Sequence, residues 1–348
     1  MQLEIIAKVK RITMIDRYSR QTILPGIGAK GQRKLADSHV LVVGCGALGT
    51  VIANTLVRAG IGRIRIVDRD FVETHNLQRQ VLYNEEDIRD QLPKAIAAER
   101  HLRKVNSSVE VEGIVADVNY TNIERLAAGV DLILDGLDNF ETRGLLNDVC
   151  LKLGIPWIYG GVLSTSGMTM NIIPGQTPCL RCMRLDSDET RTLTCETAGV
   201  LNAVPFIIGS LQSSEAIKIL VGSDAVSRDL LSIDVWEGKF RRLKIGTRPD
   251  CPACQGKYEY LEARFGMKTT LLCGRESIQV INPNVRELSF DKLARDLSPV
   301  GRVSYNRFML RFTVGAHEMV LFPDGRAIVK NTSDESVARG LYSKYIGA

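Results

Sequence analysis

Charged residues that follow two apolar segments could bind and activate a nucleotide. Asn76 and Arg79 come shortly after the segment RIRIVD, and Lys94 begins a helical pattern in QLPKA. Asp135 and Asp138 lie three residues apart where VDLILDGLDN ends. Cationic side chains neutralise phosphate charge and a carboxylate can hold Mg²⁺. This series is therefore typical of nucleotidyl transfer.

A glycine-rich turn precedes these charges. VLVVGCGALGT contains Gly44, Gly46 and Gly49 in the spacing G-x-G-x-x-G, between an apolar segment and a helical pattern. Such a turn brings backbone N–H groups and a helix N-terminus to a phosphate. Asp68 ends the next apolar segment, 24 residues after Gly44, where a carboxylate can accept hydrogen bonds from ribose hydroxyls. On the turn and Asp68 alone, NAD and ATP fit equally well.

The remaining residues favour ATP with Mg²⁺ over NAD. Hydride transfer needs a pair such as His–Asp or Tyr–Lys, and no suitable pair is recognisable around the four histidines. A dehydrogenase also has no use for a series of Arg79, Lys94 and Asp138 after the turn. An NAD-dependent oxidoreductase remains the alternative.

Four of the eight cysteines form two C-x-x-C pairs, Cys179/Cys182 and Cys251/Cys254. One pair alone could be redox-active, but two pairs on either side of a folded segment predict a closed, structural Zn²⁺ site. The competing interpretations are a disulfide or free thiols. A further alternative is a non-catalytic protein in which the Zn²⁺ site supports a scaffold for a ubiquitin-like partner.

Cys195 in TLTCETAG lies outside both pairs, just ahead of a long apolar helix. A lone cysteine is usually a small buried apolar residue, but polar neighbours and a helix N-terminus favour a reactive thiolate here. We interpret Cys45, Cys150 and Cys273 as structural.

The elements that position these residues alternate regularly between strand and helix. Strand patterns at HVLVVG, RIRIVD, VEVEGIV, VDLILDG and WIYGG alternate with helical patterns, which predicts a Rossmann-like, mostly parallel sheet with helices on both faces. MTMNIIPG, LLSIDVW and GKFRRLKI predict an antiparallel extension, separated by the long apolar helix VPFIIGSLQSSEAIKILVG.

The chain is predicted to contain two domains. Residues 16–262 form the larger one and residues 263–348 a small C-terminal α/β domain, while residues 1–15 are an N-terminal appendage. The formal net charge is only +5 with no dense Lys/Arg tract, which gives no indication of nucleic-acid binding. No sequence feature indicates a membrane span or a signal peptide, so we expect a cytoplasmic protein.

The series RYSRQ, GCGALG, VDRDFVETHNLQRQ, QLPKA, DGLDN, CLRC, TCETAG and CPAC resembles the ThiF/MoeB/HesA family. These adenylyltransferases activate ubiquitin-like sulfur carriers. The resemblance covers roughly Asp16 to Tyr260, and the C-terminal part looks similar to the extension of some ThiF proteins.

The resemblance implies a role for each site residue. Asp68 holds the ribose, while Asn76, Arg79 and Lys94 contact ribose and phosphates. Asp138 handles Mg²⁺, and Asp135 supports the nucleotide pocket. Arg20, in RYSRQ, reaches the triphosphate bound to the other subunit of a homodimer, and Cys195 matches the position of the family's sulfur-transfer or thioester cysteine.

The implied partner is a sulfur carrier that ends in Gly-Gly, and a cysteine desulfurase or sulfurtransferase can act with it. Adenylation of the carrier's C-terminal glycine gives an acyl-adenylate and pyrophosphate. Thiamine thiazole, molybdopterin and thiolated tRNA synthesis all use such an enzyme, and the extension favours thiamine.

Overall fold

The computed structural model describes residues 17–183, 199–262, 269–271, 276–281 and 288–346. Two compact units are present. One takes in residues 17–183 and 200–262, and the other takes in the described residues from 269 onwards.

An eight-stranded sheet forms the centre of the first unit, in the order β3-β2-β1-β4-β5-β6-β7-β8. Strands β1 to β5 pair in parallel, and β6 to β8 continue the sheet in antiparallel fashion. The predicted fold class is thus confirmed. The strands are β1 His39–Val43, β2 Arg63–Asp68, β3 Glu110–Val115, β4 Leu132–Asp135, β5 Trp157–Leu163, β6 Ser166–Ile172, β7 Leu230–Asp234 and β8 Lys239–Leu243.

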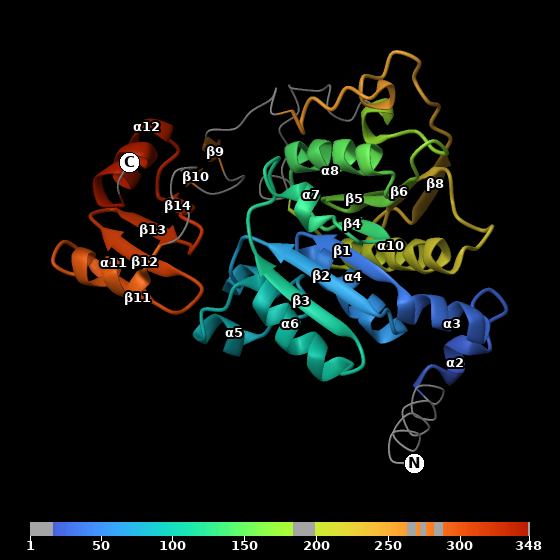
Figure 1. Cartoon of the computed structure of the whole chain (residues 1–348), viewed down its shortest axis with the longest axis horizontal. Helices are drawn as coiled ribbons and strands as arrows, with labels where there is room; N and C mark the ends of the chain where they lie inside the picture. Colours follow the sequence, from blue (N-terminus) through green and yellow to red (C-terminus); the bar gives the residue numbers. More distant parts are fainter. Residues whose placement is uncertain (1–16, 184–198, 263–268, 272–275, 282–287, 347–348) are drawn as a thin grey trace. The chain divides into compact units, whose positions relative to one another are not determined.

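Helices cover both faces of this sheet, because its central strands are apolar on both sides. All four residues of β4 are buried, as are the last four of β1. Figure 1 shows α4 and α6 on one face and α7 and α8 on the other. The helices are α2 Ser19–Thr22, α3 Gly28–Asp37, α4 Ala47–Ala59, α5 Glu85–Arg89, α6 Lys94–Val105, α7 Ile123–Leu126, α8 Phe140–Leu153 and α10 Ala203–Val221.

Helix α10 has the length and apolar composition of a membrane span. It packs against α4, β5 and β6, as the core helix of a globular domain does. Its Gln212 is fully buried and donates through Nε2 to the carbonyl oxygens of Asp135 (3.0 Å) and Ile158 (3.2 Å). The polar side chain therefore joins the helix to the sheet.

The parallel register brings the ends of β1, β2 and β4 to one edge of the sheet. Val43 pairs with Val67 on one side and with Asp135 on the other. The glycine turn after β1, Asp68 at the end of β2 and the loop after β4 therefore lie together at the carboxyl edge, where α/β proteins bind ligands.

The second unit has a six-stranded antiparallel sheet in the order β11-β12-β13-β14-β10-β9. Two helices, α11 and α12, contribute Phe290, Leu297, Ala338 and Tyr342 to a core with one face of this sheet. Its elements are β9 Thr269–Leu271, β10 Ser277–Val280, α11 Phe290–Leu297, β11 Arg302–Tyr305, β12 Leu310–Val314, β13 His317–Leu321, β14 Ala327–Lys330 and α12 Glu335–Tyr345.

Candidate nucleotide site and cysteine cluster

The glycine turn is tightly packed except at its middle glycine. Gly44 has φ +86°, and a Cβ at Gly49 would lie 2.0 Å from the carbonyl oxygen of Gly44. A Cβ at Gly46 would meet only the side chain of Gln80, at 3.8 Å. The protein's own packing therefore does not demand a glycine at 46. The space there is open at the N-terminus of α4, where free N–H groups can face an anion.

A buried ion pair lies beside this turn. Lys94, at the start of α6, donates to Asp70 Oδ2 (3.0 Å), and its side chain is only 8% exposed. Burial lowers the pKa of Lys94, but the carboxylates of Asp70 and Asp68 outweigh burial and raise it. The ammonium therefore keeps its charge next to the carboxyl edge of the sheet.

Asp68 connects the ion pair to the glycine turn. Its carboxylate accepts hydrogen bonds from the backbone N–H groups of Cys45 (2.6 Å) and Asp70 (2.7 Å). Burial raises the pKa of Asp68, and the nearby Lys94 opposes that rise. A carboxylate offers about four acceptor positions, so these two bonds leave capacity for ligand hydroxyls.

Asn76 and Arg79 lie in the loop after β2, around a 3-10 helix, Thr74–Asn76. Asn76 is buried, and its Oδ1 accepts from the backbone N–H of Glu73 (3.1 Å). Arg79 donates to the carbonyl oxygen of His75 (2.9 Å) and makes no ion pair within the described part of the chain. Among the described residues, no carboxylate therefore neutralises its positive charge.

Asp138 is exposed on the loop between β4 and α8. Its Oδ1 accepts a long hydrogen bond from Asn139 Nδ2 (3.5 Å). Burial lowers the pKa values of Lys94, Arg69 and Arg143, but nearby carboxylates outweigh burial, and Asp138 is among them for all three. Asp138 thus combines an accessible carboxylate with proximity to the buried cations.

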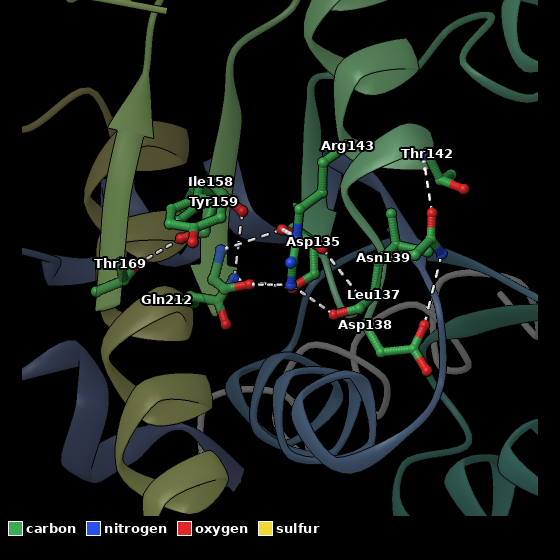
Figure 2. A network of polar contacts seen from close by, with 11 residues as sticks. Asp135, Leu137, Asp138, Asn139, Thr142, Arg143, Ile158, Tyr159, Thr169 and Gln212 are labelled. Carbon is green, nitrogen blue, oxygen red and sulfur yellow. Dashed lines mark hydrogen bonds and ion pairs between the residues drawn. The ribbon is translucent and has the colours of Figure 1, made fainter. Parts of the chain in front are cut away.

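Asp135 is fully buried below this loop (Figure 2). Its carboxylate accepts from Arg143 Nε (2.8 Å) and from the backbone N–H groups of Leu137 (2.8 Å) and Gly160 (3.3 Å). Burial raises the pKa of Asp135, opposed chiefly by the Arg143 guanidinium. The geometry gives Asp135 an internal role in which it organises the loop from below.

Several residues at this edge escaped the sequence analysis. Asp70 pairs with Lys94, Arg69 donates to Asp117 Oδ1 (2.7 Å), and Arg143 pairs with Asp135. One signal was available: Asp70 lies two residues after Asp68, so alternation alone places it at the same strand end. Arg143 gave a weaker signal, as a charge beside the apolar residues of α8.

Arg20 is not at this site in its own chain. It is exposed on α2, next to Gln21, whose Nε2 donates to the carbonyl oxygen of Ala59 (2.9 Å). Ala59 ends α4, whereas the glycine turn precedes the start of that helix. Thirteen helical residues separate the two ends by about 20 Å.

The sulfur atoms of Cys179, Cys182, Cys251 and Cys254 all lie within 4.8 Å of one another. Sulfur–sulfur contacts of 3.4 to 3.7 Å join them. Four thiolates at about 2.3 Å from a central Zn²⁺ would be about 3.8 Å apart, whereas a disulfide requires about 2.05 Å. The cluster has the size of a tetrahedral metal site and too great a spacing for disulfides.

Helix α8 carries the contacts that hold the cluster. Asn147 Oδ1 accepts from the backbone N–H of Leu180 (2.8 Å), and Asp148 Oδ2 accepts from that of Tyr260 (2.8 Å). Leu180 lies between the two cysteines of the first pair, and Tyr260 lies six residues after the second pair. The two bonds therefore tie both cysteine segments to the same helix. Cys45 and Cys150 are buried, and burial raises the pKa of the Cys45 thiol to about 12. Cys195, Cys273 and residues 1–15 lie outside the described residues.

The comparison with protein families agrees with this arrangement. The ThiF family matches residues 18–253, which is more than half of the chain. The chain belongs to the ThiF family. The predicted resemblance is therefore confirmed, and the matched region contains the glycine turn, the charged loops, the first C-x-x-C pair and Cys251 of the second.

Two curated relatives extend the comparison. A sulfur carrier protein ThiS adenylyltransferase from Bacillus subtilis is 40% identical over 338 residues, covering 96% of this chain and 100% of the relative. A SAMP-activating enzyme E1 from Haloferax volcanii is 39% identical and covers 70% of this chain and 89% of the relative. The first match extends through the second unit, which the family match does not include.

A solved structure shares the fold of the first unit. The structure of E. coli MccB with ATP superposes with a TM-score of 0.59 and 27% identity, covering 68% of this chain and 74% of that one. That protein was therefore crystallised with the nucleotide that the charged residues of this chain predict.

Proposed function

We propose that this chain uses ATP to adenylate the C-terminal glycine of a ubiquitin-like sulfur carrier protein. The observation that carries the proposal is the buried Lys94–Asp70 pair beside the open glycine turn, with the accessible Asp138 at the same strand edge. The similarity to ThiS and SAMP activating enzymes supports the same activity.

ATP would lie across the carboxyl edge of the sheet. Gly44, Gly46 and Gly49 would present backbone N–H groups to its phosphates, and Asp68 would accept from the ribose hydroxyls. Asn76 would support the ribose end, while Arg79 and Lys94 would hold the phosphates. Asp138 would bind Mg²⁺, which withdraws charge from the phosphates when bound. The exposure of Asp138 fits that role.

The adenylation step needs no general base from the protein. The carrier's terminal carboxylate has a pKa near 3.5 and is ionised at neutral pH. Its oxygen attacks the α-phosphorus, the bond from that phosphorus to the β-phosphate oxygen breaks, and pyrophosphate leaves. The barrier comes from bringing an anion to a polyanion, and Arg79 and Lys94 lower it by fixed positive charge.

The cysteine cluster would hold one Zn²⁺ in a structural role. Its four donors suit Zn²⁺, and all of them belong to the protein, which leaves no position for a substrate. Bound metal would fix residues 179–183 and 251–262 against α8.

A homodimer would complete the site through Arg20, which is remote from the glycine turn of its own chain. Large apolar side chains are exposed near this end of the unit, including Ile23 (71%) and Leu24 (51%), and Phe206 is exposed on α10 (37%). Burying such residues against a second copy is favourable.

Cys195 would accept the activated carrier after adenylation. A thiolate attack on the acyl carbon would release AMP and leave a thioester; a persulfide on the same cysteine would instead give an acyl-disulfide. A cysteine desulfurase or sulfurtransferase would supply the sulfur. Full sulfur transfer by Cys195→Ala in vitro would refute this role.

The pathway is proposed from the second unit. The alignment with the ThiS adenylyltransferase includes this unit, which favours thiamine thiazole synthesis in the cytoplasm over the molybdopterin and tRNA thiolation routes. We propose residues 16–262 as the adenylation domain and 263–348 as a separate carrier- or partner-binding domain. The small protein that co-purifies with the chain, ending in Gly-Gly, would name the pathway.

Carrier-dependent exchange of pyrophosphate into ATP tests the activity. We expect exchange only when Mg²⁺ and a carrier with an intact Gly-Gly terminus are both present. ATP with Mg²⁺ should raise the melting temperature and NAD should not. A rise with NAD alone would favour an oxidoreductase, and the absence of exchange with any sulfur carrier would favour a zinc scaffold.

A further inference from the structure

We propose that Arg143 is a positioning residue that holds the loop carrying Asp138 in the geometry required for Mg²⁺ binding. The inference rests on the proposed function, because it concerns the same site. It adds a buried residue whose hydrogen bonds go to the protein itself, to Asp135, Leu137 and Gly160. Figure 2 shows Arg143 reaching from α8 to the end of β4, and its Nη2 also donates to Gly160 in the middle of β5.

The residue before Asp138 is held at both of its backbone groups. The N–H of Leu137 donates to Asp135 Oδ1 (2.8 Å), and its carbonyl oxygen accepts from Arg143 Nη2 (2.6 Å). One peptide earlier, the N–H of Gly136 donates to the carbonyl oxygen of Val43 (2.8 Å). The backbone is therefore fixed up to the residue at which the exposed carboxylate begins.

Arg143 is itself held from several directions. Nε donates to Asp135 Oδ2 (2.8 Å) and Nη2 also donates to the carbonyl oxygen of Gly160 (2.8 Å). The rings of Phe140 and Tyr159 each lie 5.3 Å from the guanidinium carbon. The side chain is 6% exposed. Its orientation is thus set by the protein before any ligand binds.

These contacts require an arginine. A planar guanidinium presents donors in fixed directions, so one group can reach a carboxylate and two carbonyl oxygens at once. Lysine would keep the charge beside Asp135 but would concentrate its donors on one atom. The substitution Arg143→Lys should therefore loosen the loop without leaving the buried carboxylate unpaired.

The direct test measures Mg²⁺ affinity by thermal shift. The melting temperature is recorded in saturating ATP as Mg²⁺ is titrated, for the wild type, Arg143→Lys, Asp138→Asn and the double variant. Substitution of residues that orient a metal ligand typically lowers metal affinity by 10–100-fold. We expect Arg143→Lys to raise the half-saturating Mg²⁺ concentration about tenfold in the wild-type background and less than about twofold with Asn at 138.

Arg65→Lys is the matched control. Arg65 also holds a carboxylate, Glu112 Oε2 (2.9 Å), and a carbonyl oxygen, that of Leu126 (2.7 Å), but it lies within β2. The substitution Arg65→Lys should lower the melting temperature measured without ligand and leave the Mg²⁺ midpoint unchanged. If Arg143→Lys does not fold, Phe140→Leu replaces it, because this side chain is 46% exposed and packs on the guanidinium. Phe140→Leu should raise the Mg²⁺ midpoint less than Arg143→Lys does, and this rise should also vanish in the Asp138→Asn background.

The outcomes separate this inference from the proposed function. If ATP and Mg²⁺ stabilise the wild type and carrier-dependent exchange occurs, but Arg143→Lys shifts the midpoint equally in both backgrounds, Arg143 is structural only and the inference is wrong. If the wild type shows no exchange and no Mg²⁺-dependent stabilisation by ATP, the proposed function fails and the inference fails with it.

Discussion

Helix α8 contacts two sites of opposite character, one near its start and one at its middle. Near its start, Arg143 and Asp135 fix a loop in which the side chain of Asp138 stays exposed. Further along, Asn147 and Asp148 hold segments whose four cysteines face one another. The first arrangement leaves charge available to a ligand, and the second uses every donor within the protein. The exposed carboxylate of Asp138, held on a fixed backbone, is suited to binding a ligand. The four cysteines, which face only one another, are suited to stabilising the fold.

The largest effect that would sharpen this contrast is expected from Asp138→Ala. Exchange of pyrophosphate into ATP should fall about a thousandfold, because the substitution removes a charge needed in the transition state. The melting temperature without ligand should stay within about one degree, because exposed positions contribute little to stability. Unchanged exchange, measured beside the wild type, would remove Asp138 from the mechanism.

Substitution in the cysteine cluster should act on stability first. If the cluster holds one Zn²⁺ per chain as proposed, Cys251→Ser should lose that zinc and lower the melting temperature by roughly 10 °C, since a structural Zn²⁺ contributes folding free energy. Metal analysis and calorimetry would measure both effects.

The control for that substitution is Cys150→Ala, which changes a buried cysteine outside the cluster. It should retain zinc and lose about 1 kcal/mol of unfolding free energy. Full zinc content and an unaltered melting temperature in Cys251→Ser would mean that the cluster does not bind metal.

An intermediate effect would show whether the open site extends over two chains. Arg20→Ala and Asp138→Ala should each be inactive as homodimers. In a mixed dimer purified through two different tags, one of the two sites has both residues, so about half of the wild-type exchange should return. A mixed dimer with no activity would exclude Arg20 from the neighbouring site.

The smallest effect concerns Asp148. Burial raises its pKa to about 6, against 3.8 for an ordinary aspartate, and hydrogen bonds from Tyr260 and Leu261 oppose the rise. Between these values the folded state binds more protons than the unfolded state, so the unfolding free energy falls as pH rises. The full penalty, at most about 3 kcal/mol, applies above pH 6.

Asp148→Asn should remove that pH dependence. Its amide oxygen can still accept from the backbone N–H of Tyr260, and it carries no charge to bury. We expect a melting temperature about 5 °C above the wild type at pH 7.5 and a difference that shrinks towards pH 5. Parallel curves for the two proteins over this range would show that Asp148 carries no buried charge at neutral pH.

Local sequence signals predicted the fold well wherever periodicity and turn chemistry agreed. The strands β1 to β5 follow from apolar segments, most of which end in glycine or aspartate, and the pair β7–β8 from two alternating segments. Helix α3 was not predicted. Three of its residues, Gly31, Gln32 and Leu35, form the buried face, and only one of these is a large apolar side chain.

The site was predictable only in part, for a physical reason. Asp68, Lys94 and Asp138 are recognisable because each follows a strand or begins a helix. Lys94 pairs with Asp70 across the connection between β2 and α6, and Arg143 pairs with Asp135 across the loop between β4 and α8. Both pairs depend on how these irregular connections fold back on the sheet, which helix and strand periodicity does not encode.

Gly160 and Gln212 are close enough to constrain how this sequence can change over time. A Cβ at 160 would lie 2.5 Å from the amide of Gln212, which already donates to two carbonyl oxygens. Even an alanine at 160 would displace that amide and weaken the hydrogen bonds that join α10 to β4 and β5. A larger residue at 160 therefore needs a compensating change at 212, so descendants of this sequence that lose Gly160 should lose Gln212 as well.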